Sequence, residues 1–94
     1  MKIVISSGVL EKLQEKHHVD KREIQQCFEN RVKGYLKDTR EEHLTDPPTM
    51  WFIAETNAGL LLKIAFVPVK GDVIIKTAYE PNKNELSIYS KYAI

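Results

Sequence analysis

The stretch from Met50 to Tyr79, MWFIAETNAGLLLKIAFVPVKGDVIIKTAY, has the strongest structural pattern in the chain. It contains three apolar segments rich in β-branched and aromatic residues, which are typical of strands. Asn57-Ala58-Gly59 separates the first two as a three-residue hairpin loop, and Lys70-Gly71-Asp72 turns the chain before the third. We therefore predict an antiparallel meander with strands over 51–56, 60–67 and 73–79.

Two helices are predicted before the meander. Ser6 and Ser7 offer hydroxyl caps for a helix that runs to about His17. Asp20, with Glu23 three residues later, has the spacing of a capping box and predicts the start of a second helix. Apolar residues then recur at helical spacing through this second segment.

The remaining segments are shorter or less regular. Asn82 and Glu85 repeat the capping-box spacing and predict a short C-terminal helix. The start of the chain, 2–5, is expected to be extended, and 31–37 has a pattern that allows a further strand. The polar segment 38–49 ends in two prolines, which predicts an irregular connection.

This order of elements predicts an α+β fold with two N-terminal helices, an antiparallel meander sheet of three to four strands and a short C-terminal helix. A chain of 94 residues has room for a single core, so we expect one domain spanning 1–94. With so small a core, a shallow groove or an open sheet face is expected to carry any activity, rather than an enclosed cavity.

Composition narrows the function classes. The net charge of +1 is not the strongly basic balance typical of many nucleic-acid-binding proteins, although local basic patches remain possible. Cys27 is the single cysteine, which excludes an internal disulfide and a CxxC site and, in its apolar setting, predicts a buried thiol. No signal peptide or membrane-spanning run is present, so a cytoplasmic protein without membrane contact is expected.

Two lysines stand out in the predicted strands. Lys63 and Lys76 each lie among apolar neighbours. A two-residue turn between the last two strands would place Ala65 opposite Lys76 and Lys63 opposite Ala78, so that both lysines project from one face. Two ammonium groups on an open sheet face can stabilise a phosphate during phosphoryl transfer. The alternative is that these lysines only keep an exposed sheet face soluble.

Three further residues are candidates for proton transfer. Tyr79 ends the last strand, where it can assist proton transfer or stack on a base, or simply pack against the sheet. His17 and His18 end the first helix, and either can act as general acid or base. The alternative for the histidines is a favourable interaction with the helix dipole.

Other residues are candidates for RNA binding. Trp51 is either a core residue or, if exposed beside Lys63, a stacking platform. Arg40 and His43 lie in the polar connection, where they can approach the same face or remain solvated. The histidines and carboxylates show no recurring metal-site spacing, and no nucleotide-cofactor motif is present, so neither a metal nor a cofactor is expected.

Several short strings resemble BrnT-type proteins, the toxin halves of bacterial toxin–antitoxin pairs within the wider RelE-like ribonuclease superfamily. They cover nearly the whole chain: LQEKHHV at 13–19 followed by Glu23 and Phe28, WFIA at 51–54, GLLL at 59–62, IIKTAY at 74–79, and Glu85 with Tyr89 near the C-terminus. The resemblance implies a RelE/BrnT-like fold and a metal-independent endoribonuclease that sets the 2′-hydroxyl against the adjacent phosphate. It also implies two partners, RNA (messenger RNA, free or on the ribosome) and a cognate antitoxin protein.

The chain departs from the family pattern at two positions. Leu60 and Tyr79 stand where BrnT-type proteins usually carry arginine, so Lys63 and Lys76 are expected to supply the cations of the site. An endoribonuclease would then use these lysines with Tyr79 and His17 or His18. The alternative is a non-catalytic domain of the same fold that binds a protein partner or nucleic acid through this face.

Overall fold

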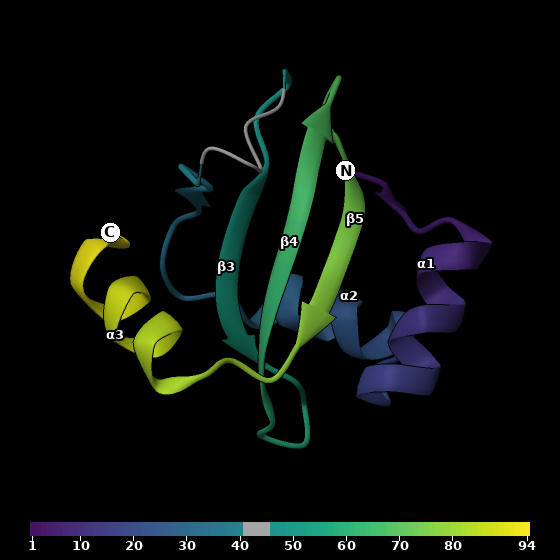
Figure 1. The fold of residues 1–94 in the computed structure, drawn as a ribbon, viewed down its shortest axis with the longest axis horizontal. Coiled ribbons are helices and arrows are strands. Elements are labelled where there is room, and N and C mark those ends of the chain that lie inside the picture. Colours follow the sequence, from purple (N-terminus) through teal and green to yellow (C-terminus); the bar gives the residue numbers. More distant parts are fainter. Residues whose placement is uncertain (41–45) are drawn as a thin grey trace.

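A computed structural model describes residues 1–40 and 46–94, so the expectation for His43 lies outside the described residues. The centre of the fold is the predicted meander, formed by β3 (Met50–Glu55), β4 (Leu61–Val69) and β5 (Asp72–Tyr79), which pair in antiparallel fashion. Figure 1 shows these three strands side by side.

Within residues 1–40 and 46–94, two short edge strands extend the sheet to five strands, in the order β1-β5-β4-β3-β2. The first, β1 (Ile3–Val4), pairs with β5 in parallel, while β2 (Leu36–Lys37) pairs with β3 in antiparallel fashion. The prediction of an antiparallel sheet with three to four strands is therefore wrong in two respects: the sheet has more strands in the described residues, and its β1 edge is parallel. Asp72 fixes the parallel edge, because its side chain accepts a hydrogen bond of 2.8 Å from the backbone N–H of Lys2.

The turns of the meander follow the predicted chemistry. Lys70 and Gly71 have φ values of 50° and 84°, the positive pair that a two-residue type I′ turn requires. Asn57–Gly59 forms the other loop, closed by a hydrogen bond of 2.8 Å from the N–H of Thr56 to the carbonyl of Leu60.

A β-bulge at Lys76 changes the register of the last two strands. Phe66 pairs with Ile75, but Ala65 pairs with Thr77, so that Lys76 is the extra residue. As a result, Lys63 lies opposite Tyr79. The expected pairs of Ala65 with Lys76 and of Lys63 with Ala78 are wrong, because a bulge inserts one unpaired residue and shifts every later pair by one position.

The first predicted helix consists of two parts. The α-helix α1 (Ser7–Lys12) begins at Ser6, whose hydroxyl accepts from the N–H of Val9, and it continues as a π-helical turn, η1 (Leu13–His17). His18 ends this segment with φ 54°, a left-handed conformation.

The other two helices begin where their capping boxes predict. In α2 (Lys21–Asn30), the Asp20 side chain accepts from the N–H of Glu23 while the Glu23 side chain accepts from the N–H of Asp20. Asn82 and Glu85 make the same reciprocal pair at the start of α3 (Lys83–Tyr92). In the described part of the chain, no helix is long and apolar enough to cross a membrane.

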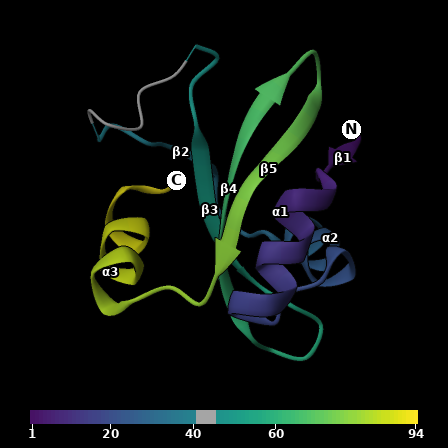
Figure 2. The ribbon, with the colours of Figure 1, turned by 45° about the vertical axis from the view of Figure 1, so that its right-hand side comes forward.

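The helices cover both faces of the sheet (Figures 1 and 2): α1 and α2 pack on one face, and α3 lies on the other. The face toward α1 and α2 holds four fully buried apolar side chains: Leu62, Ile64, Phe66 and Ile75. The face toward α3 was expected to be open. That expectation is wrong, because Trp51, Ile53, Lys63 and Ala65 on this face are each less than 9% exposed.

Candidate functional site

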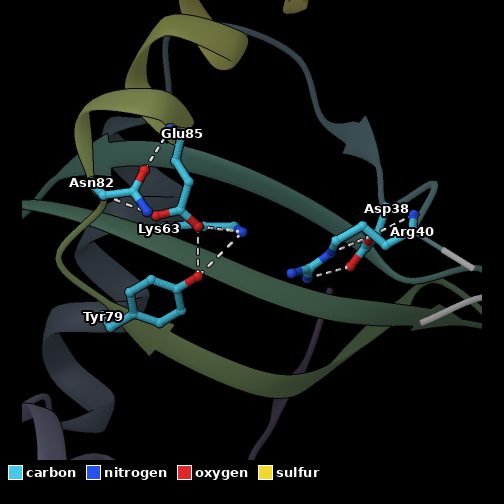
Figure 3. A network of polar contacts seen from close by, with 6 residues as sticks. All are labelled: Asp38, Arg40, Lys63, Tyr79, Asn82 and Glu85. Carbon is cyan, nitrogen blue, oxygen red and sulfur yellow. Dashed lines mark hydrogen bonds and ion pairs between the residues drawn. The ribbon is translucent and has the colours of Figure 1, made fainter. Parts of the chain in front are cut away.

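A polar cluster of Lys63, Tyr79 and Glu85 lies between the sheet and α3 (Figure 3). The Nζ of Lys63 lies 2.7 Å from Oε2 of Glu85 and 3.3 Å from the Tyr79 hydroxyl oxygen. The same ammonium lies 4.7 Å from the centre of the Trp51 ring. Because Lys63 is only 6% exposed, its charge requires such partners, and the carboxylate and the aromatic ring provide them.

Glu85 joins the C-terminal helix to this cluster with its two carboxylate oxygens. Its Oε1 accepts from the N–H of Asn82 in the capping box, and its Oε2 accepts from both Lys63 and Tyr79. Burial by itself would raise the pKa of Glu85, but the hydrogen bonds from Lys63, Tyr79 and Asn82 outweigh it and hold the pKa below its ordinary value. Glu85 is therefore an anion at neutral pH.

Tyr79 is held as a neutral phenol. Its hydroxyl donates a hydrogen bond of 2.6 Å to Oε2 of Glu85. Burial and this hydrogen bond to a carboxylate both raise the pKa of Tyr79, and they outweigh the opposing effect of Lys63. The side chain thus keeps its proton at neutral pH and is aimed by a charged acceptor.

Of the two adjacent histidines, His17 is the one that reaches the cluster. Its ring lies 5.6 Å from the ring of Tyr79, measured between centres, with the planes tilted by 38°. The contact arises because η1 packs against β5. His18 is exposed and takes the left-handed turn that leads to α2, and it makes no ring contact within the described residues.

Lys76 does not join the cluster. It is the bulged residue of β5, its side chain is exposed, and it forms no hydrogen bond or ion pair with any other described residue. The structure therefore brings together Lys63, Tyr79 and His17 from the predicted set, while Lys76 remains a separate surface cation.

Two of the residues expected to bind RNA, Trp51 and Arg40, line a pocket next to the cluster. Trp51 is 8% exposed and lines this pocket together with Lys63 and Glu85. Arg40 also lines it and pairs with Asp38 through two hydrogen bonds, of 3.1 Å from Nε and 2.9 Å from an amino nitrogen.

Glu85 is the member of the cluster that sequence reasoning missed as a functional residue. Its capping-box position indicated a structural role, and that role is real, but the box uses only one of the two carboxylate oxygens. The available signal was the position itself, since the third residue of a capped helix directs its carboxylate back toward the segment that precedes the helix.

Two other kinds of chemistry find little support. Cys27 is fully buried, as predicted. Its burial and, to a smaller extent, the nearby charge of Glu23 raise the pKa of its thiol to about 12, so the thiol is a poor nucleophile. Among residues 1–40 and 46–94, no three His, Cys, Asp or Glu side chains are grouped so that they could hold a metal ion.

Comparison with known proteins identifies the fold. The crystal structure of the Brucella abortus ribonuclease toxin BrnT matches this chain with a TM-score of 0.63 and 17% sequence identity, covering 88% of this chain and 99% of the toxin. No family model matches the sequence, and no curated protein matches it either. At this identity the similarity is one of fold, and it confirms the expectation drawn from the short motifs: the chain has a BrnT-like α+β fold.

Proposed function

We propose that this protein is an endoribonuclease of the toxin type, which cleaves RNA through attack of a 2′-hydroxyl on the adjacent phosphate. The observation that carries the proposal is the contact of His17 with Tyr79 beside the Lys63–Glu85 pair. It supports an acid–base site in a fold shared with a ribonuclease toxin. A cognate antitoxin that covers this site is part of the proposal.

In the proposed reaction, His17 and Tyr79 transfer protons. The imidazole of His17 accepts the proton of the 2′-hydroxyl as its oxygen attacks phosphorus. The bond from phosphorus to the 5′-oxygen then breaks. The Tyr79 hydroxyl exchanges its hydrogen bond to Glu85 for one to that oxygen and protonates it, which leaves a 2′,3′-cyclic phosphate and a 5′-hydroxyl. Because its pKa is raised, Tyr79 still carries this proton at neutral pH.

Lys63 and Glu85 act as positioning residues in this proposal. The ammonium of Lys63 is compensated by Glu85, so the pair orients the Tyr79 hydroxyl rather than offering a free cation to the phosphate. Lys76, exposed at the bulge, is the candidate for contact with the RNA backbone.

The test is cleavage of RNA by the pure protein, with EDTA present, and detection of 2′,3′-cyclic phosphate ends. We expect His17→Asn to lower the rate by at least about a hundredfold, the usual scale for a general base. His18→Asn is the matched control, because it changes the neighbouring histidine and asparagine tolerates the left-handed backbone. Equal rates for the two variants would refute the assigned role of His17.

The second candidate function is a non-catalytic domain that binds RNA or a protein through the same face. The ion pair between Lys63 and Glu85 favours it over catalysis, because a compensated ammonium stabilises less of the charge that develops on a phosphate during cleavage. This alternative predicts RNA binding that weakens with salt and yields no cyclic phosphate, with or without ribosomes. That result would reject the ribonuclease.

A further inference from the structure

The pocket beside the polar cluster has the size of a ligand site. It lies between α3 and the strands β2, β3 and β4, and its volume is about 560 Å³. Pockets that hold small organic molecules span roughly 300–1,000 Å³. Figure 3 shows the Arg40 side chain, paired with Asp38, extending toward the paired Lys63 and Glu85. All four residues line the pocket.

The lining of this pocket combines aromatic and apolar side chains with amides and with charged side chains of both signs. Trp51 forms buried lining, while Tyr92, 59% exposed, and Ile88, 37% exposed, belong to its outer part on α3. Leu36 adds apolar lining, and the remaining lining residues besides Lys63 and Glu85 are polar or charged: Lys37, Asp38, Thr39, Arg40, Asn82 and Asn84. Aromatic and apolar walls suit a nucleobase, amides suit its edges, and cations suit a phosphate.

We infer that this pocket binds one unpaired nucleotide of the RNA, adjacent to the phosphate that is cleaved. The base would lie against Trp51 and Tyr92, and its phosphate would face Arg40, whose guanidinium also pairs with Asp38. This inference rests on the proposed function, since it treats the ligand as a segment of the RNA substrate. The pocket is adjacent to the proposed cleavage site, because Lys63 and Glu85 line the pocket and also contact the Tyr79 hydroxyl.

The exposed rim favours a nucleotide within a chain over an isolated metabolite. Tyr92 and Lys37 are both exposed, so a longer ligand can enter and leave at this side of the pocket. Stacking on aromatic side chains tolerates every base, so we expect the pocket to require a base without demanding a particular one.

The binding test uses the four ribonucleoside 5′-monophosphates, with ribose 5-phosphate as the probe that lacks a base. Trp51 is the single tryptophan, so its indole N–H resonance in ¹H–¹⁵N spectra reports on the pocket without ambiguity. We expect the nucleotides to shift this resonance saturably at millimolar concentrations and ribose 5-phosphate to bind at least about fivefold more weakly, because it cannot stack.

Two variants sharpen the test. Tyr92→Ser removes the exposed ring and should weaken nucleotide binding at least about fivefold. Lys70→Gln removes a cation in the distant β4–β5 turn and should bind as the wild type does. The inference is overturned if no nucleotide shifts the indole resonance, if ribose 5-phosphate binds equally well, or if Tyr92→Ser has no effect.

The result of the binding test is separable from that of the ribonuclease proposal, because a mononucleotide has no internucleotide phosphodiester for the protein to cleave. A protein that binds nucleotides at Trp51 but leaves RNA intact would refute the ribonuclease and keep the pocket as a nucleotide site. A protein that cleaves RNA while its indole resonance stays unmoved would refute the pocket assignment alone.

Discussion

The ammonium of Lys63 lies 2.7 Å from the carboxylate of Glu85, and the two side chains are only 8% and 14% exposed. This pair joins the middle of the sheet to the first turn of α3. A second contact of α3 is the hydrogen bond of 2.8 Å that the Tyr89 hydroxyl donates to the carbonyl of Gly34. A buried ion pair of this kind adds little net stability against an apolar pair of the same shape, but the loss of one partner leaves a buried charge.

We therefore expect Lys63→Met to lower the free energy of unfolding by about 3 kcal/mol, because Glu85 loses its compensating charge. The double variant Lys63→Met/Glu85→Gln should recover part of this loss, since no buried charge remains. Lys76→Met is the matched control, and as an exposed site it should change stability by less than about 0.5 kcal/mol. Urea denaturation measures all three, and equal midpoints for Lys63→Met and Lys76→Met would contradict the prediction.

The acid limb of the stability profile should report on Glu85. Its pKa in the folded state lies below the ordinary value of 4.5, so the folded protein binds this proton less readily than the unfolded chain does. The stabilisation is then fully present above pH 4.5 and is lost as the pH falls from there toward the lower folded value.

Glu85→Gln, which carries no titrating carboxyl, should flatten this part of the profile. The measurement is the free energy of unfolding at a series of acidic pH values for the wild type and the variant. If the two profiles run parallel below pH 4.5, Glu85 does not carry the stabilisation assigned to it.

The two capping boxes provide a matched pair of variants. Asp20→Ala and Asn82→Ala each remove a cap and should each lower the free energy of unfolding by about 1 kcal/mol. Of the two caps, Asn82 is the one that holds Glu85, because its side chain accepts from the backbone N–H of Glu85, whose carboxylate holds Tyr79. RNA cleavage should therefore fall in Asn82→Ala and stay near wild type in Asp20→Ala, and equal rates for the two would reject the positioning role of Glu85.

Local chemistry explains why much of this fold was predictable from the sequence. The capping box at Asp20, the positive φ at Gly71 and the apolar run of β4 each depend on residues near one another in the chain. The cover of α3 over Lys63 was not predictable in the same way, because it depends on the path of the chain after β5.

The β-bulge at Lys76 caused the largest difference between the predicted and the observed candidate site. The sequence around Lys76 alternates as an ordinary strand does, and Gly, the usual marker of a bulge, is absent there. The single extra residue places Lys63 opposite Tyr79, which is what brings the ammonium within 3.3 Å of the phenol oxygen. Glu85 then completes a cluster that no short sequence motif describes.

The last prediction concerns two glycines that should respond to alanine in opposite directions. Gly71 has φ +84° in the β4–β5 turn, so Gly71→Ala places a side chain in the left-handed region and should lower the free energy of unfolding by about 1–2 kcal/mol. Gly8 lies in α1 with open space where a Cβ would be, so Gly8→Ala should raise it by about 0.5–1 kcal/mol. Thermal and urea unfolding measure both changes, and shifts of the same sign would contradict either the turn geometry or the helical assignment of Gly8.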